Sequence, residues 1–176
     1  AVKEVFVRLY EKGYIYQGKR IINWDPVQRT ALSNIEVIHK EIEGAMYYFK
    51  YKIVDSDQEL VIATTRPETM FADQAIFVHP DDERYKDLVG KYAINPANGE
   101  KLPIMADSYI DMDFGTAVMK CTPAHDPNDF ALAKKYNLDM PICMNDDGTM
   151  NELCHKYQGM DRFECRKQLV ADFEAA

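Results

Sequence analysis

The sequence predicts an α+β domain built around a β-barrel-like sheet, with short helices at its periphery. Short segments rich in β-branched and aromatic residues recur through the middle of the chain. Polar, turn-forming residues separate most of these segments, and few helical patterns lie between them. Many short strands with few helices favour a barrel-like arrangement over a doubly wound sheet, in which helices alternate with strands. The chain has 176 residues, 47% of them apolar, which is enough to bury one such core.

The predicted strands show either alternation of apolar and polar residues or a run of β-branched and aromatic ones. Two short β-like pieces are expected near the start of the chain, at 14–16 and 20–24, before a turn at 25–26. The main strands are expected at 35–42, 46–54, 60–65, 75–78, 102–105, 116–121 and 140–143.

Helices are expected at the two ends of the chain and between some of the strands. Apolar residues recur at helical spacing over 2–10, and Gly13 follows the pattern as a natural end. Shorter helices are expected at 81–88 and 128–136. A last helix is expected from about residue 161 to the end, with its apolar side formed by Phe163, Leu169, Val170 and Phe173.

We divide the chain into three parts on this pattern. Residues 1–30 are interpreted as a flanking segment that leads into the domain, 31–150 as its core, and 151–176 as a C-terminal helical segment that packs on the domain or leaves it. The first residue is Ala1 rather than Met, and no hydrophobic targeting region follows it. We therefore expect the chain to be a segment of a longer protein.

Charge and cysteine usage narrow the class of function. A net charge of −8 argues against binding to a long stretch of nucleic-acid backbone, but it is compatible with a pocket that takes one single-stranded end. The four cysteines contain no CxxC pair, which disfavours a zinc site. We expect free thiols in a reducing, cytoplasmic environment. No apolar run approaches the roughly 18 residues that would indicate a membrane span, so no membrane partner is expected.

The first candidate site segment is Thr-Thr-Arg-Pro-Glu-Thr at 64–69, which follows a predicted strand. Hydroxyl groups and a guanidinium at the end of a strand, aimed by a rigid proline turn, suit the binding of a small polar ligand. The same residues fit a capped turn, with a threonine as cap and Pro67 near the first position of a short helix. The pattern alone leaves both interpretations open.

The second candidate segment covers 114–130. Strand alternation places Phe114, Thr116, Val118, Lys120 and Thr122 on one side, provided that no bulge intervenes. Asp126 and Pro127 then have the residue types of a helix N-cap and first helical position. A carboxylate can cap a helix with one oxygen and bind a ligand with the other. A metal site formed by His125 and the aspartates is a further alternative, although the spacing fits no standard zinc motif.

No motif marks a covalent nucleophile or a phosphate-binding loop. The sequence contains no Gly-x-Ser-x-Gly and no glycine-rich phosphate cradle. If the protein is an enzyme, we expect it to activate water in a polar pocket without a covalent intermediate.

Several segments resemble the editing domain, also called connective peptide 1, of class I aminoacyl-tRNA synthetases for branched aliphatic amino acids. The segments are Thr-Thr-Arg-Pro-Glu-Thr-Met at 64–70 and Thr-Pro-Ala-His-Asp-Pro-Asn-Asp-Phe at 122–130. With further segments at 79–85, 147–151 and 157–163, the resemblance is closest to the valyl-tRNA synthetase family and extends over nearly the whole chain.

Leucyl and isoleucyl enzymes fit less well. The leucyl family usually has Asp at the position of Glu68 and Gln at that of Pro127, and the isoleucyl family has a Trp-containing segment in place of 66–68. The chain also departs from the valyl pattern at one place. The usual Gly-Thr-Gly-Ala-Val is here Gly-Thr-Ala-Val-Met at 115–119, so Ala117 replaces a glycine beside the expected pocket.

The resemblance implies a proofreading hydrolase that cleaves the ester of threonyl-tRNA(Val). It implies that Asp126 binds the α-ammonium, that Asp129 binds this ammonium or the side-chain hydroxyl, and that Lys120 and Thr122 line the amino-acid pocket and position water. We assign catalysis to Asp126, Lys120 and Thr122, and substrate binding to Thr64, Thr65, Arg66, Glu68, Thr69, Phe114 and Asp129. Phe114 would stack on the terminal adenine and Arg66 would contact the sugar or phosphate, whereas His125 is expected to be structural.

The same resemblance sets the expected partners and cofactors. The partners are the 3′ end of mischarged tRNA(Val) and the rest of a parent synthetase. No metal or other cofactor is expected in this domain, since the ATP and Mg²⁺ of such synthetases act at an aminoacylation site whose signature motifs are absent here. The alternatives are a leucyl or isoleucyl editing domain, a tRNA-end-binding module that has lost hydrolysis, with Ala117 as the lesion, and a metal-dependent phosphoesterase.

Overall fold

The alternating segment that begins near residue 46 forms the first hairpin of the main sheet. In the computed structural model, which describes residues 1–175, β3 (Tyr47–Ile53) pairs in antiparallel fashion with β4 (Glu59–Thr64). Phe49, Tyr51 and Ile53 face the core while the residues between them face outward, as the period of two requires. The strands predicted at 46–54 and 60–65 are thereby confirmed.

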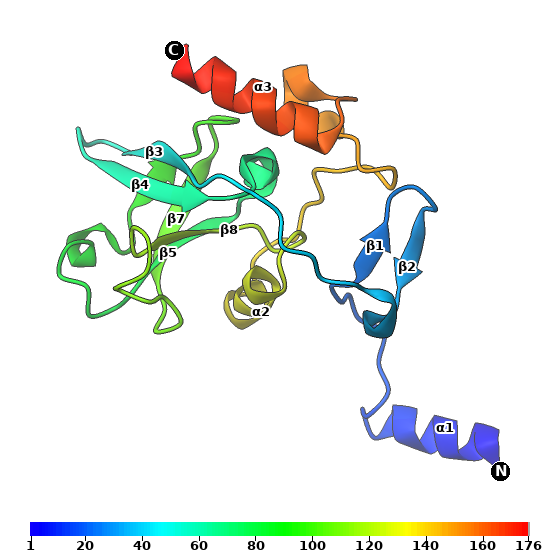
Figure 1. Ribbon diagram of the computed structural model, residues 1–176. Helices are drawn as coiled ribbons and strands as arrows, with labels where there is room; N and C mark the ends of the chain where they lie inside the picture. Colours follow the sequence, from blue (N-terminus) through cyan, green and yellow to red (C-terminus); the bar gives the residue numbers. More distant parts are fainter. Residues whose placement is uncertain (176) are drawn as a thin grey trace.

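Four further strands complete a six-stranded sheet in the order β4-β3-β6-β7-β5-β8. They are β5 (Ala75–Val78), β6 (Tyr92–Ile94), β7 (Lys101–Ala106) and β8 (Val118–Cys121). The β5–β7 pair is parallel and the others are antiparallel. The two outermost strands, β4 and β8, also contact each other, so the sheet curls into a nearly closed barrel (Figure 1). The predicted α+β, barrel-like class is confirmed.

Three α-helices lie outside the sheet in the described part of the chain, and Figure 1 shows their different relations to the barrel. α2 (Pro127–Tyr136) has Asp126 as its N-cap and Asn137 as its C-cap, and the φ of 53° at Asn137 is the left-handed conformation that often closes a helix. α3 (Arg162–Glu174) lies across the short 3₁₀ helix η2 (Pro67–Ala72) and buries Cys165 and Leu169. α1 (Val2–Glu11) extends away from the barrel and buries no residue.

The core consists of two clusters of buried apolar residues. The larger one fills the space between the inner face of the sheet, η2, α3 and the 3₁₀ helix η4 (Glu152–Tyr157). Phe173 of α3 closes it by packing edge-on against Phe49, with ring centroids 5.4 Å apart. The smaller cluster, which includes Phe77 and Leu132, holds α2 against β5. Apolar packing therefore holds the second candidate segment against the barrel, both before and after the start of α2 in the sequence.

The N-terminal region forms a small unit beside the barrel (Figure 1). It contains the two-stranded hairpin β1 (Asn23–Asp25) and β2 (Thr30–Leu32), followed by the 3₁₀ helix η1 (Asn34–Glu36). The Trp24 indole donates a hydrogen bond to the carbonyl of Asp146 at 2.8 Å, which joins the hairpin to the loop before η4. None of the described helices is both long and apolar enough to cross a membrane.

Some predicted elements are wrong. Residues 14–16, 35–42 and 140–143 form no strand in the described structure, because no neighbouring strand is available to pair with them. The helix expected at 81–88 is a series of turns ending in the 3₁₀ helix η3 (Lys86–Leu88). There the Asp82 carboxylate accepts the backbone N–H of Arg84, which competes with helical hydrogen bonding. Phe163, expected on the apolar side of the last helix, is half-exposed under the Arg162 guanidinium.

The strand predicted at 116–121 begins two residues late because of Ala117. This alanine has a φ of 57°, a left-handed conformation in which its Cβ is crowded by the backbone, and the preceding Gly115 has a φ of 59°. The glycine usual in the valyl pattern would adopt this conformation without the steric cost. The substitution therefore places backbone strain within the second candidate segment.

We predict that Ala117→Gly stabilises the protein. Relief of the left-handed conformation, worth about 1–2 kcal/mol, outweighs the extra chain entropy of glycine, about 0.5–1 kcal/mol. Urea unfolding should show a net gain of about 0.5–1 kcal/mol. The matched control, Ala133→Gly in the right-handed helix α2, should lose about 1 kcal/mol or more. A loss at both positions would show that Ala117 carries no strain.

Candidate functional site

The two candidate segments meet in one cleft. It has a volume of about 580 Å³ and lies between the end of β4, the start of β8, the N-terminus of α2 and the loop 109–117. Side chains of several predicted residues line it: Thr64, Thr65, Arg66, Thr69, Phe114, Lys120, Thr122, Asp126 and Asp129. Of the predicted substrate-binding and catalytic residues, Glu68 does not line it.

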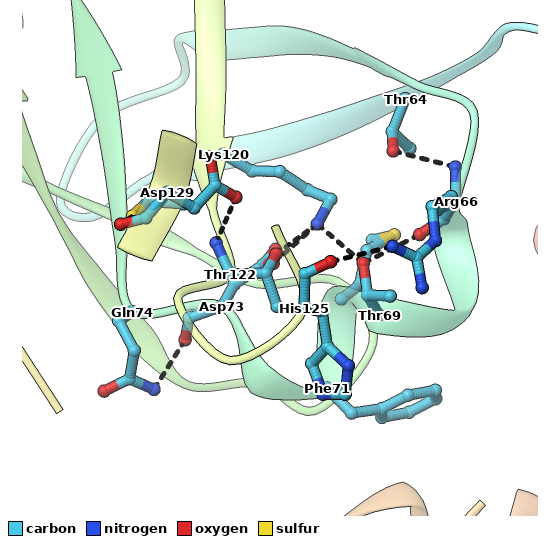
Figure 2. Close-up of polar contacts among 12 residues, drawn as sticks. Thr64, Arg66, Thr69, Phe71, Asp73, Gln74, Lys120, Thr122, His125 and Asp129 are labelled. Atoms are coloured by element: carbon cyan, nitrogen blue, oxygen red, sulfur yellow. Dashed lines mark hydrogen bonds and ion pairs between the residues drawn. The ribbon is translucent and has the colours of Figure 1, made fainter. Parts of the chain in front are cut away.

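The floor of the cleft is built around a buried ion pair. The Lys120 ammonium lies 2.9 Å from Asp73 Oδ1 and 2.9 Å from Thr69 Oγ1, and it also donates to Thr122 Oγ1 (Figure 2). Asp73 is fully buried and Lys120 is 8% exposed. Thr122 Oγ1 donates to Asp73 Oδ1 at 2.6 Å, and the Tyr51 hydroxyl donates to Asp73 Oδ2 at 3.0 Å. Every polar group of the floor therefore has a partner, which a buried charge requires.

The buried hydrogen-bond network of the floor shifts the pKa values of Asp73 and Tyr51. Burial raises the pKa of Asp73, against the opposing effect of the Lys120 charge and the hydrogen bonds it accepts. Burial together with the Asp73 charge raises the pKa of the Tyr51 phenol well above its usual value. Tyr51 is thus held as a neutral donor, and its proton keeps Asp73 oriented toward Lys120 and Thr122.

The N-terminus of α2 supplies two carboxylates with different environments. Asp126 caps the helix: its Oδ1 accepts the N–H of Asn128 at 2.8 Å and of Asp129 at 3.2 Å. Among the described residues its Oδ2 has no hydrogen-bond donor, so this oxygen is available to a ligand. Asp129 is buried, accepts the backbone N–H of Thr122 at 2.7 Å, and has its pKa raised to about 6, mainly by burial and further by the nearby Asp126 charge.

The threonine-rich segment forms the opposite wall. Thr64 Oγ1 accepts the backbone N–H of Arg66 at 3.1 Å, and Thr69 Oγ1 donates to the Arg66 carbonyl at 2.9 Å. Pro67 is the first residue of η2, as the capped-turn interpretation expects, but the expected threonine cap is wrong, because the N-cap is Arg66 and it makes no side-chain cap hydrogen bond. The threonines line the cleft instead. The Arg66 guanidinium donates to the His125 carbonyl at 2.8 Å, which ties this wall to the start of α2 (Figure 2).

His125 lies beside the cleft with its ring already engaged. Its Nε2 accepts the backbone N–H of Cys143 at 3.1 Å, which assigns the ring proton to Nδ1. Burial lowers the pKa of His125 to about 4, so the ring is neutral near pH 7. A ring nitrogen that already accepts a backbone hydrogen bond is poorly suited to remove a proton from water. This geometry agrees with the structural role expected for His125.

Glu68 does not occupy the position expected of a substrate-binding residue. Its side chain is fully buried behind the cleft and accepts two hydrogen bonds from Arg166 of α3, at 2.8 Å from Nε and 2.7 Å from Nη2. This bidentate pair fixes η2 to the C-terminal helix. Glu68 Oε1 also lies 3.6 Å from Arg66 Nε, so the carboxylate pairs with Arg66 from behind the cleft instead of facing a ligand.

Three residues important to the site were missed from the sequence: Asp73, Tyr51 and Arg166. Asp73 carried a usable signal, since it is the one charged residue in an otherwise apolar or amide-bearing run at 70–78. A carboxylate in a buried run needs a cation, and Lys120 is its counterpart in a second buried strand. Tyr51 and Arg166 gave no local signal, because their roles come from long-range contacts.

We predict that Lys120→Met destabilises the protein by about 3–5 kcal/mol, since it leaves the buried Asp73 carboxylate without its cation. Urea unfolding near pH 7 measures this change. The control is Lys50→Met, which breaks an exposed ion pair with Glu59 and should change stability little. Equal effects of the two substitutions would contradict the role given to the buried pair.

Comparisons with known proteins agree with the geometry. The family model described as leucyl-tRNA synthetase, editing domain, matches residues 80–161. The chain is 61% identical over 170 residues to the valine–tRNA ligase of Mesoplasma florum, covering 96% of this chain and 20% of that protein. It is 58% identical over 176 residues to that of Bacillus subtilis, covering 100% of this chain and again 20% of the relative. The chain thus spans about one fifth of the length of these relatives.

A solved structure shares the fold. The LeuRS of Agrobacterium radiobacter K84, in a ternary complex with tRNA and LeuAMS, superimposes with a TM-score of 0.61 at 18% identity. The match covers 98% of this chain and 30% of that one. In the described residues, no group of three or more His, Cys, Asp or Glu side chains is arranged to hold a metal ion. Over nearly its whole length the chain thus corresponds to a segment of valine–tRNA ligases, which are class I aminoacyl-tRNA synthetases, and its residues 80–161 match the model of a synthetase editing domain.

Proposed function

We propose that this domain hydrolyses the ester of threonyl-tRNA(Val) after transfer, using a positioned water and no covalent intermediate. The observation that supports the proposal is the polar floor of the cleft, where Lys120, Thr122, Thr69 and Asp129 lie together. In this proposal the amino-acid side chain of the ester lies on that floor. Its partners are the 3′ end of the mischarged tRNA and the remainder of a valine–tRNA ligase, and its place is the cytoplasm. The relatives' printed names supply valine as the amino acid.

A polar site is needed because threonine and valine have nearly the same shape. An apolar pocket rejects such an isostere only about 10²-fold, a value known from valyl-tRNA synthetase itself. A second pocket can do better when its hydrogen-bonding groups are satisfied by threonine and left unpaired by valine. Each unmade bond to a buried group costs roughly 1–3 kcal/mol.

The floor has spare acceptors rather than spare donors. The three protons of Lys120 go to Asp73, Thr69 and Thr122. The hydroxyl protons of Thr69 and Thr122 go to the Arg66 carbonyl and to Asp73. Each of these two hydroxyl oxygens keeps one free lone pair, and Asp129 keeps its Oδ1. The threonyl hydroxyl can donate to such acceptors, whereas the corresponding methyl group of valine cannot.

The rim of the cleft suits the ester and the nucleotide that carries it. Asp126 Oδ2 would bind the α-ammonium, which is the charge-assisted contact that orients the ester. Thr64 and Thr65 would hold the attacking water, and the exposed ring of Phe114 would stack on the terminal adenine. Arg66, which keeps a partly exposed guanidinium, would contact the sugar or phosphate. Holding the ester and the water together supplies much of the rate enhancement without a general base.

The main rival is a module that binds the tRNA end without hydrolysing it, since Ala117 changes the backbone beside the pocket. Turnover separates the two: a binding module would protect the threonyl ester, and an editing domain would release threonine repeatedly.

Added EDTA should leave the release of threonine unchanged, because the proposed mechanism uses no metal. Loss of activity with EDTA would favour the metal-dependent phosphoesterase class instead.

Asp126→Asn tests the ammonium contact without removing the helix cap, because asparagine caps as well as aspartate. We predict that hydrolysis of threonyl-tRNA(Val) falls about 10- to 100-fold, the equivalent of one charge-assisted hydrogen bond. Single-turnover release of threonine measures the change. Asp161→Asn, at the N-cap of α3, is the matched control and should leave the rate unchanged. A wild-type rate of hydrolysis in Asp126→Asn would contradict the proposal that Asp126 binds the α-ammonium.

The raised pKa of Asp129 predicts a pH dependence. The carboxylate forms as the pH rises through about 6, and only the ionised group accepts a hydrogen bond with both oxygens. After subtraction of spontaneous ester hydrolysis, the rate should therefore rise between about pH 5 and pH 7. Asp129→Asn should lower the rate and remove this inflection. An unchanged profile in the variant would assign the inflection to another group.

A further inference from the structure

The segment His-Pro-Asp-Asp-Glu-Arg-Tyr at 79–85 has no part in the cleft, yet two of its side chains reach the loop that borders it. This loop, residues 109–117, carries Phe114 at its exposed turn. The segment follows β5 directly. It is therefore placed to fix the loop from outside.

Arg84 holds the side of the loop that precedes Phe114. Its Nη2 donates to the Met112 carbonyl at 3.0 Å. The guanidinium is itself fixed by Asp82, with Nε at 2.9 Å from Oδ1 and Nη2 at 2.6 Å from Oδ2. Asp82 is 4% exposed, so its position is set by the surrounding structure. Such a bidentate pair leaves the guanidinium little freedom to turn away from the loop.

Tyr85 holds the side that follows Phe114. Its hydroxyl donates to the Thr116 carbonyl at 2.9 Å, and its ring packs against the main apolar core. The two anchored carbonyls, of Met112 and Thr116, thus lie two residues before and two residues after Phe114. Between them the chain makes a tight turn in which the Ala117 N–H donates to the Phe114 carbonyl at 3.0 Å.

We propose that Arg84 and Tyr85 are positioning residues that hold Phe114 at the rim of the cleft so that the terminal base of the RNA can stack on it. Phe114 needs such support because its own side chain is 71% exposed and has few contacts to orient it. The left-handed conformation of Ala117 adds strain, which the two anchors oppose. This inference rests on the proposed function, since it assigns Phe114 to the nucleotide.

Tyr85→Phe tests the contact of the Tyr85 hydroxyl with the loop by removing one oxygen atom. The matched control is Tyr92→Phe, because Tyr92 is a half-exposed tyrosine on β6. With threonyl-tRNA(Val) as substrate, Tyr85→Phe should raise KM about threefold to tenfold and change kcat by less than about twofold. In a Phe114→Ala background, Tyr85→Phe should have no further effect on KM. Arg84→Gln should behave like Tyr85→Phe in both backgrounds. A KM that is unchanged, or that rises equally in both backgrounds, overturns the proposal.

A second measurement does not depend on the substrate. Hydrogen exchange of the Ala117 amide should become at least about fivefold faster in Tyr85→Phe, and stay unchanged in Tyr92→Phe. Unchanged exchange overturns the anchor even if the domain proves to be a hydrolase. Faster exchange in a protein that does not release threonine would retain the anchor and reject the proposed function. The two failures are therefore distinguishable.

Discussion

The buried ion pair between Lys120 and Asp73 is the interaction on which the site depends. Removing two charges from water is costly, and the cost is offset only when each charge has well-placed partners. Here Tyr51, Thr69 and Thr122 supply them, and they come from β3, η2 and the end of β8. The pair thus joins three separate parts of the chain at one point. The network around this pair also engages the hydrogen-bond donors of the floor. The groups of the floor that remain open to the cleft are therefore oxygen acceptors.

The barrel provides the rigidity that this arrangement needs. Strands β4 and β8 meet at the closure of the sheet; the first candidate segment begins at the end of β4, and the second contains β8. Outside the floor, the contact of Arg66 with the His125 carbonyl fixes the two walls to each other, and the pair of Glu68 with Arg166 fixes η2 to α3. The C-terminal helix therefore helps to fix the geometry of the site, although none of its residues lines the cleft. A hydrolytic pocket without a covalent nucleophile relies on such fixed geometry.

Much of the fold and part of the site were predictable from the sequence. The hairpin β3–β4, strand β5 and helix α2 have strong local patterns, and the residues that line the cleft are mostly those singled out by hydroxyl, ammonium and carboxylate groups at strand and helix ends. Elements decided by long-range pairing were not predictable. Residues 35–42 alternate as a strand does but have no partner, and the three-residue strand β6 is too short to give a pattern. Glu68 was misassigned because only the tertiary structure shows Arg166 beside it, and Asp73 became important only through Lys120.

The most direct test of the account is a comparison of two esters of the same tRNA. Threonyl-tRNA(Val) and valyl-tRNA(Val) differ only by a hydroxyl in place of a methyl group, so their rates of hydrolysis by this domain report on the polar floor alone. With at least one hydrogen bond worth about 1.5–3 kcal/mol, the threonyl ester should be cleaved about 10- to 100-fold faster, or more. Equal rates for the two esters, or no acceleration of either above the spontaneous rate, would contradict the claim that the acceptor-rich floor selects threonine.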